Sequence, residues 1–438
     1  MKTPIYDFVR NYADSSISRC HMPGHKGRGA LGCEAFDITE ISGADVLYSA
    51  EGIIAESESR LTELYGTSHS FYSTEGSTLA IKAMLALVSE RVGGERPLIL
   101  AARNVHAAFV RGAALLDLDV EWIYPAGANH LCACPVSAGE VAAAIDAATR
   151  LPSAVYLTSP DYLGNILDIS AISRVCRERN IPLLVDNAHG AYLRFLPEDI
   201  HPITLGAAMC ADSAHKTLPV LTGGAYLHIS PDFEEYADRA RAALSLFAST
   251  SPSYLTLCSL DLCNRELTTD YPEKIASLTE KISEIKAEIK SAGMPVCHSE
   301  PLKIVVRLGE PLADHLRGLG IEPEFSDRDY TVLMLTPNND GSQLERVRSA
   351  LLSFDTSGCG VAENSPSPAR HERAMTIRDA VLSRSETVSV EQSIGRICAA
   401  PTVSCPPAVP IVISGERITP EDVALFKYYG INTVSVVK

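Results

Sequence analysis

The sequence lacks a surplus of basic residues and lacks any long hydrophobic run. Its 438 residues include 38 Lys and Arg against 54 Asp and Glu, a formal net charge of −16. Nucleic-acid-binding proteins and proteins that adhere to anionic membranes normally carry a basic surplus, so we expect neither kind of partner. No apolar run approaches the ~20 residues of a transmembrane helix. The N-terminal residues also lack the apolar stretch of a secretory signal.

The 12 cysteines lack the spacing of a metal site or of a disulfide framework. No Cys-x-x-Cys pair occurs, and the single Cys-x-Cys, at Cys132 and Cys134, has no second half at zinc-site spacing. In a chain without a secretory signal, this pattern is typical of reduced thiols. We therefore expect a cytoplasmic protein and no bound metal.

Apolar patterning predicts an α/β fold. Between residues 50 and 230, short apolar runs without alternation are separated by helical stretches, the first of them at residues 53–65. Such runs are typical of strands buried on both faces of a mainly parallel, doubly wound sheet. The expected strands lie at residues 97–101, 120–124, 154–157 and 182–185, with residues 223–229 as an antiparallel partner.

Composition divides the chain into four segments. Residues 1–265 form an N-terminal segment and a large domain, and residues 266–355 form a connecting helix and a small α/β domain. Residues 356–369, in a stretch rich in Ser, Gly and Pro, are the predicted linker, and residues 370–438 form a C-terminal domain.

Lys216 lies in a Ser-Ala-His-Lys sequence directly after an apolar run, and Asp186 ends another apolar run thirty residues earlier. Ligands of open α/β sheets bind at the carboxyl ends of the strands. Pyridoxal 5'-phosphate (PLP) needs a lysine for its aldehyde and a carboxylate for its pyridine nitrogen. The pair therefore indicates a PLP site. Taken singly, Lys216 fits an ordinary loop lysine, and Asp186 fits a helix cap or a metal ligand.

Two further features suit the same cofactor. Residues 73–78 bring small and hydroxyl side chains to the start of a long helix, where backbone N–H groups attract a phosphate. The alternative is a plain helix cap by Ser73 or Ser77. His106 follows the next predicted strand and is able to stack on a pyridine ring and to offer a proton. A purely structural histidine is the alternative.

A Pro-Gly-His-Lys-Gly motif at residues 23–27, followed later by Ser-x-His-Lys, is specific in this order. Other distinctive stretches lie at residues 51–54, 74–78, 103–106, 158–164, 186–190, 250–255, 391–397 and 415–416. With these motifs the chain resembles the Orn/Lys/Arg decarboxylase family of fold-type-I, aspartate-aminotransferase-like PLP enzymes. Residues 45–50 and 405–409 depart from the family pattern, which leaves the specificity for the substrate side chain open.

The resemblance implies a role for each site residue. Lys216 would hold PLP covalently, Asp186 would pair with its pyridine nitrogen, and His106 would stack on the ring opposite Ala188. His189 is implied as a further catalytic residue at the cofactor rim. The remaining implied cofactor contacts are Gly76, Ser77, Thr78, Thr158, Ser213, His215 and Thr250, the last reaching across from a partner subunit.

The resemblance further implies decarboxylation of arginine, lysine or ornithine to agmatine, cadaverine or putrescine, in polyamine metabolism. It implies a homodimer with a shared site and a short form without an N-terminal wing. A cationic substrate side chain needs a carboxylate partner, for which Glu324, Asp327 and Glu416 are candidates. Two alternatives stay open, because fold does not determine chemistry. One is another fold-type-I reaction, by an aminotransferase or a lyase, and the other is a PLP-binding protein without turnover.

Overall fold

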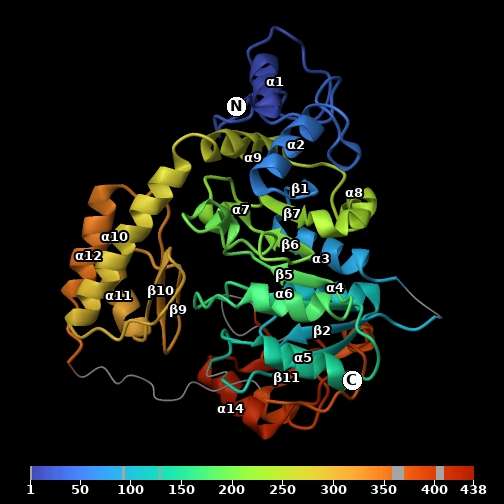
Figure 1. Cartoon of the computed structure of the whole chain (residues 1–438), viewed down its shortest axis with the longest axis vertical. Helices are drawn as coiled ribbons and strands as arrows, with labels where there is room; N and C mark the ends of the chain where they lie inside the picture. The colour runs from blue at the N-terminus through green and yellow to red at the C-terminus, as the bar shows by residue number, and fades with distance from the viewer. Residues whose placement is uncertain (1, 91–93, 128–129, 358–368, 401–408) are drawn as a thin grey trace. The chain divides into compact units, whose positions relative to one another are not determined.

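The computed structural model describes residues 2–90, 94–127, 130–357, 369–400 and 409–438 (Figure 1). The chain forms two compact units, each assembled from two separate stretches. The first unit comprises Met1–Val88 and Pro182–Ile275, and the second unit comprises Ser89–Ile181 and Ala276–Lys438. The domain boundaries expected at residues 265, 355 and 369 remain predictions. Residues 358–368 of the predicted linker and residues 405–408 of the departing segment lie outside the described residues.

The first unit is built on four strands in the order β1-β7-β6-β5. They are β1 (His69–Ser73), β5 (Leu183–Asp186), β6 (Met209–Asp212) and β7 (Ala225–Ile229). Strands β5 and β6 are parallel, and β7 is antiparallel to both β6 and β1. The antiparallel partner expected at residues 223–229 is thereby confirmed. Strand β1 was not anticipated from the sequence.

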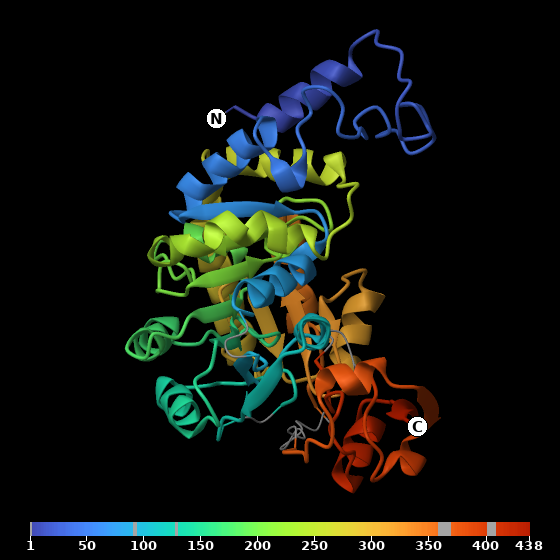
Figure 2. The ribbon, with the colours of Figure 1, turned by 90° about the vertical axis from the view of Figure 1, so that its right-hand side faces the viewer.

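Helices surround these strands. They are α1 (Pro4–Ala13), α2 (Ile53–Tyr65), α3 (Gly76–Leu87), α7 (Ala214–Thr217), α8 (Ala237–Ser245) and α9 (Tyr254–Leu267), with 3-10 turns η1 (Leu47–Ser49), η2 (Ala191–Phe195) and η3 (Pro231–Tyr236). Helix α3 packs against β6, β7 and α8 (Figure 2). Helix α1 packs against α9, where the buried carboxylate of Asp261 accepts the backbone N–H groups of Ile5 and Tyr6.

The second unit contains three parallel strands in the order β4-β2-β3. They are β2 (Leu98–Ala102), β3 (Asp119–Ile123) and β4 (Ala154–Thr158), and the helices beside them are α4 (Ala107–Leu116), α5 (Ala138–Ala147) and α6 (Ile169–Arg177). Each of these strands lies within one residue of its expected bounds. Helix α5 starts with a capping box between Ser137 and Glu140, which satisfies backbone N–H groups at its first turn.

The rest of the second unit forms two smaller sheets, both antiparallel. The first has the order β8-β10-β9, with β8 (Lys303–Val306), β9 (Phe325–Ser326) and β10 (Thr331–Met334). The helices of this part are α11 (Glu310–Gly318), α12 (Gly341–Leu352) and the portion of α10 (Tyr271–Ser291) that follows Ile275. The second pairs β11 (Ser385–Ser389) with β12 (Thr433–Val437), near α13 (Ile377–Leu382), η4 (Val390–Ser393) and α14 (Pro420–Tyr428). Among the described residues, none of the helices combines the length and the apolar character that a membrane span requires.

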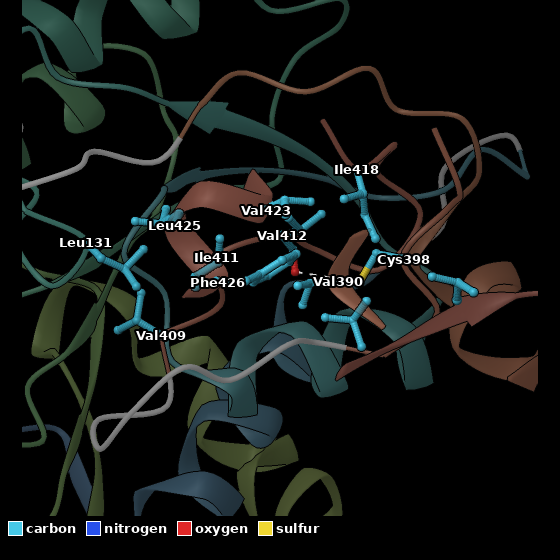
Figure 3. Packing of buried hydrophobic residues seen from close by; sticks show 12 residues of the cluster. Leu131, Val390, Cys398, Val409, Ile411, Val412, Ile418, Val423, Leu425 and Phe426 are labelled. Carbon is cyan, nitrogen blue, oxygen red and sulfur yellow. Dashed lines mark hydrogen bonds between the residues drawn. The ribbon is translucent and has the colours of Figure 1, made fainter. Parts of the chain in front are cut away.

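A cluster of buried apolar side chains holds the C-terminal segment together (Figure 3). Its members are Leu131, Val390, Cys398, Val409, Ile411, Val412, Ile418, Val423, Leu425, Phe426, Val434 and Val436. Buried Arg103 extends from the end of β2 to the same segment. Its guanidinium donates to the carbonyls of Pro410 and Ile411, at 2.9 and 2.7 Å.

Phe426→Ala should destabilise this cluster. Phe426 is the largest apolar side chain in the cluster and is fully buried, so truncation costs about 3–5 kcal/mol of unfolding free energy. Guanidinium unfolding followed by circular dichroism measures the loss. Leu382→Ala is the matched control, because Leu382 is 70% exposed and its truncation should change stability by less than about 0.5 kcal/mol. Equal losses for the two variants would contradict the central place of Phe426.

Candidate active site

Two adjacent parallel strands of the first unit carry the predicted lysine and carboxylate. Asp186 is the last residue of β5, and its register partner on β6 is Ala211. Asp186 is buried, and its Oδ1 accepts the N–H of Ala188 at 3.3 Å. Lys216 lies four residues beyond the end of β6, in the short helix α7. The carboxyl ends of β5 and β6 thus meet at one edge, as expected for a ligand site of an α/β sheet.

The structure brings Lys216 and His189 into contact. The distance from Nζ of Lys216 to Nε2 of His189 is 3.1 Å, and His189 is buried. His189 belongs to the turn that follows Asp186, so one turn supplies both a carboxylate and an imidazole. The contact fixes the position of the lysine amine, which in its neutral form is the nucleophile.

The start of helix α3 has the features of a phosphate site. Ser77 and Thr78 occupy its first turn, and the hydroxyl of Ser213 donates to the hydroxyl of Ser77 at 2.8 Å. Gly76 donates its N–H to the carbonyl of Gly223 at 2.7 Å. A Cβ on Gly223 would lie 2.8 Å from the carbonyl oxygen of Thr74, so only glycine allows this close approach. Backbone N–H groups and hydroxyls therefore converge where an anion is favoured.

Three further predicted contacts lie in the same unit. His215 donates from Nδ1 to the carbonyl of Gly224 at 2.9 Å, and Ala188 is half-buried in the turn after Asp186. Thr250 is exposed, and the N–H of its neighbour Ser249 donates to Glu75 at 2.7 Å. Glu75 is the N-cap residue of α3 in the same chain. The loop that carries Thr250 is thus tied to the predicted phosphate helix within one chain.

His106 and Thr158 lie in the second unit. His106 is the N-cap residue of α4, and its Nδ1 accepts the N–H of Ala108 at 3.1 Å. The bond leaves the ring half-buried in a defined orientation after β2. Thr158 ends β4, and its buried Oγ1 has no hydrogen-bond partner among the described residues. Thr158 thus lies at the carboxyl end of a parallel strand and His106 lies after one, and their cofactor roles stay predictions.

The three acids proposed for the substrate side chain differ in their surroundings. Glu324 is exposed, and its Oε1 accepts the hydroxyl of Tyr162 at 3.1 Å. Asp327 is buried and lies 3.1 Å from Nε2 of His130. Glu416 is buried, accepts the N–H of Ile413 at 2.7 Å and lies 3.5 Å from the guanidinium of Arg103. Asp327 and Glu416 are therefore engaged inside the protein, and the substrate role of each acid stays a prediction.

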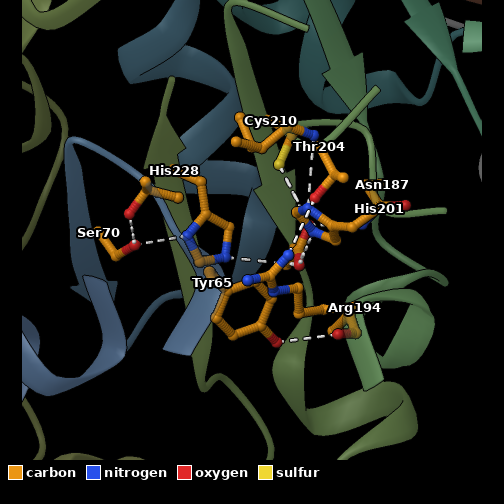
Figure 4. A network of polar contacts seen from close by, with 12 residues as sticks. Tyr65, Ser70, Asn187, Arg194, His201, Thr204, Cys210 and His228 are labelled. Carbon is orange, nitrogen blue, oxygen red and sulfur yellow. Dashed lines mark hydrogen bonds and ion pairs between the residues drawn. The ribbon is translucent and has the colours of Figure 1, made fainter. Parts of the chain in front are cut away.

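Sequence reasoning gave no role to Asn187, which is labelled in Figure 4, or to Asp212, and the structure joins the two by a hydrogen bond of 2.7 Å. Each follows or precedes a predicted site residue directly, since Asn187 comes after Asp186 and Asp212 comes before Ser213. That adjacency was the available signal. The two histidines that also contact Asp212, His201 and His228, carry no motif in the sequence.

Solved structures share this fold over the whole chain. The lysine decarboxylase LdcF of Francisella novicida has a TM-score of 0.81 at 17% sequence identity, covering 100% of this chain and 81% of that chain. The constitutive lysine decarboxylase of E. coli has a TM-score of 0.79 at 16% identity, covering 100% of this chain and 82% of that chain. The predicted α/β, fold-type-I class is confirmed.

A relative in Bacillus subtilis named arginine decarboxylase is 27% identical to this chain, covering 97% of this chain and 93% of the relative. An uncharacterized protein of the same organism, YaaO, is 28% identical over the same shares of the two chains. Residues 3–308 match the major domain of the Orn/Lys/Arg decarboxylase family, and residues 362–434 match its C-terminal domain. The expected decarboxylation of a basic amino acid is confirmed by these matches: the chain belongs to the Orn/Lys/Arg decarboxylase family and is an amino acid decarboxylase.

Proposed function

We propose that the chain decarboxylates arginine to agmatine with pyridoxal 5'-phosphate as its cofactor, in polyamine metabolism. The observation that carries the proposal is the contact of Lys216 with His189 beside the strand that ends in Asp186. Arginine is favoured over lysine and ornithine because four relatives, 26–28% identical over 94–97% of this chain, are named arginine decarboxylase.

The donor set of the first unit fits PLP group by group. Lys216 suits the aldehyde, Asp186 suits a protonated pyridine nitrogen, and Ser77 with Ser213 at the start of α3 suits the phosphate. Thr158 belongs to the second unit, and its buried hydroxyl, which has no partner among the described residues, stays a proposed contact of the cofactor. PLP, when bound, draws electrons from the Cα–carboxylate bond and so allows carbon dioxide to leave.

The chain's own residues prepare and orient this chemistry. His189 Nε2, 3.1 Å from Nζ, shares a hydrogen bond with Lys216 and would help to orient the amine toward the aldehyde. Burial of Asp186 keeps water away from its carboxylate, which strengthens its attraction for a cationic ring nitrogen. The ring of His106, oriented by its bond to Ala108, offers a flat surface for stacking.

The substrate guanidinium needs a carboxylate, since charge-assisted pairs of this kind are short and geometrically specific. Glu324 suits this role best of the three candidate acids because it is exposed, while Asp327 and Glu416 have buried partners. Tyr162 donates its hydroxyl to Glu324 and would hold the carboxylate in one orientation.

A homodimer in the cytoplasm completes the proposal. Exposed apolar side chains of the first unit, Leu221 at 52% and Leu246 at 65%, suit burial against a second copy. The cysteines described by the structure are free thiols, mostly buried, as suits a reducing compartment. Exposed Thr250 would then contact the phosphate of the neighbouring subunit.

Lys216→Ala should abolish both cofactor capture and turnover. The variant lacks the amine that bonds the aldehyde, so PLP should dissociate on dialysis and the visible absorbance of bound cofactor should be lost. Lys274→Ala is the control, because Lys274 is a half-exposed helix lysine paired with Asp270, and it should keep both properties. Retention of covalently bound PLP by Lys216→Ala, shown by borohydride reduction and mass spectrometry, would refute the assignment.

A substrate panel should identify arginine as the preferred substrate. The enzyme is incubated with arginine, lysine and ornithine, and carbon dioxide, amines and keto acids are quantified by mass spectrometry. We expect stoichiometric agmatine and carbon dioxide from arginine and no keto acid. Cadaverine as the main product would identify lysine as the preferred substrate, and putrescine would identify ornithine. Keto-acid formation would point to transamination instead.

The purified protein should sediment as a particle of two chains. Sedimentation equilibrium should report a mass near twice the 47.1 kDa of one chain. Leu246→Glu places a charge on an exposed apolar position and should shift the mass toward one chain. Leu151→Glu is the control, since Leu151 is 75% exposed in the second unit. A single-chain mass for the wild type would overturn the dimer.

A further inference from the structure

Asp212, the last residue of β6, is the centre of a buried polar network in the first unit, and four of its neighbours, Asn187, His201, Cys210 and His228, are labelled in Figure 4. Oδ2 lies 3.0 Å from Nε2 of His201 and 3.5 Å from Nε2 of His228, and Oδ1 accepts the amide of Asn187 at 2.7 Å. Oδ1 also accepts the thiol of Cys210 at 3.6 Å. Asp212, His201, His228, Asn187 and Cys210 are all 0% exposed. A buried carboxylate of this kind is tolerated because each of its oxygens has partners.

The hydrogen-bond roles show why this position carries a carboxylate. Nδ1 of His201 accepts the N–H of Ile203 at 3.4 Å, so Nε2 carries the proton and donates it to Asp212. Asn187 donates from its amide nitrogen. These neighbours present donors, and only an acceptor with two oxygens satisfies them all. Burial alone would raise the pKa of Asp212, but the charges and hydrogen bonds of His201 and His228 hold the pKa well below its usual range.

The second histidine is fixed from both sides. Nδ1 of His228 shares a hydrogen bond of 2.7 Å with Oγ of Ser70, and the ring of Tyr65 stacks on it at 4.3 Å between centroids. Burial, the largest cause, lowers the pKa of His228. The carboxylate of Asp212 is therefore surrounded by hydrogen-bond donors whose own positions are fixed by further contacts.

Asp212 joins the two segments that carry the proposed cofactor residues. Asn187 comes directly after Asp186 and two residues before His189, and Asp212 comes directly before Ser213 and four residues before Lys216. Gly190 leaves room for the amide of Asn187, because a Cβ at this position would lie 2.0 Å from Oδ1 of Asn187. The backbone N–H of Asn187 also donates to the carbonyl of Ala211 at 3.0 Å. These two bonds join the segments whose side chains Lys216 and His189 approach each other to 3.1 Å.

We propose that Asp212 is a positioning residue of the cofactor site, whose buried carboxylate holds the Asp186–His189 turn in register with the Lys216 segment. This inference rests on the proposed PLP-dependent function. Asp212 is fully buried and would act through Asn187 and its chain neighbours. His201, Cys210 and Asp212 lie close enough together to resemble a set of metal ligands. Their closeness is explained by the hydrogen bonds that His201 and Cys210 donate to Asp212.

The test compares Asp212→Asn with a matched buried aspartate. Asn is isosteric but replaces one acceptor oxygen with a donor, so it must face a donor from Asn187 or His201. We expect the Kd for PLP to rise about tenfold or more, the effect of losing one charge-assisted hydrogen bond. The visible circular dichroism of bound PLP, which reports the orientation of the ring, should also change. Both quantities are measured on the full-length protein, without substrate.

Asp261→Asn is the control. Asp261 is also 0% exposed and accepts the N–H groups of Ile5 and Tyr6, but its partners lie apart from the proposed cofactor residues. It should lower Tm while its Kd for PLP stays within about twofold of the wild type. If Asp261→Asn weakened PLP binding as much as Asp212→Asn, the effect would be general destabilisation and the inference would be overturned.

Asn187→Ala is the second variant, and it tests the positioning role of Asp212 if Asp212→Asn does not fold. This variant removes the hydrogen bond between Asn187 and Asp212 but leaves the contacts of Asp212 with His201 and His228. It should therefore raise the Kd for PLP, as Asp212→Asn does, with a smaller loss of Tm. If Asn187→Ala bound PLP with wild-type affinity and wild-type circular dichroism, the inference would be overturned and the proposed function would be unaffected. A wild-type protein that binds no PLP would instead overturn the proposed function, so the two failures are distinguishable.

Discussion

The parallel pairing of β5 with β6 is the contact on which the candidate active site depends. Its register sets Asp186 opposite Ala211, so the turn after β5 and the segment after β6 begin at the same edge. Neighbouring strands lie about 4.8 Å apart, which brings a strand-end carboxylate and a nearby lysine within reach of one small ligand. A shift of one residue would turn every side chain of a strand to the opposite face and would separate the two groups.

Hydrogen bonds beyond the strand ladder convert this proximity into a defined geometry. Gly76 bonds to Gly223, Ser213 to Ser77, and Asn187 to Asp212, so each segment of the site is attached to another. Polar groups in a buried edge must find partners, since an unsatisfied donor or acceptor costs stability. The same bonds that meet this requirement also hold the groups that need a fixed orientation.

The acidic net charge contributes little to the recognition of a cationic substrate. Of three acids that sequence reasoning offered, Asp327 and Glu416 are buried with partners of their own, and Glu324 is exposed beside Tyr162. The interaction energy of a charged group depends far more on its immediate surroundings than on the net charge of the protein. In the proposed function, specificity for a guanidinium or an ammonium would therefore depend on one or two positioned carboxylates.

The sequence by itself determined the α/β alternation, the helix at residues 53–65, and the candidate roles of Asp186 and Lys216, because burial periodicity and strand-end placement are local properties. It did not reveal α1, the β11–β12 pair or α14, whose strands and helices mix exposed and buried positions. Only the tertiary structure joined Lys216 to His189 across 27 residues and Asn187 to Asp212 across 25. Such contacts arise when strands pair in register, and no local pattern encodes which distant side chain will then lie opposite.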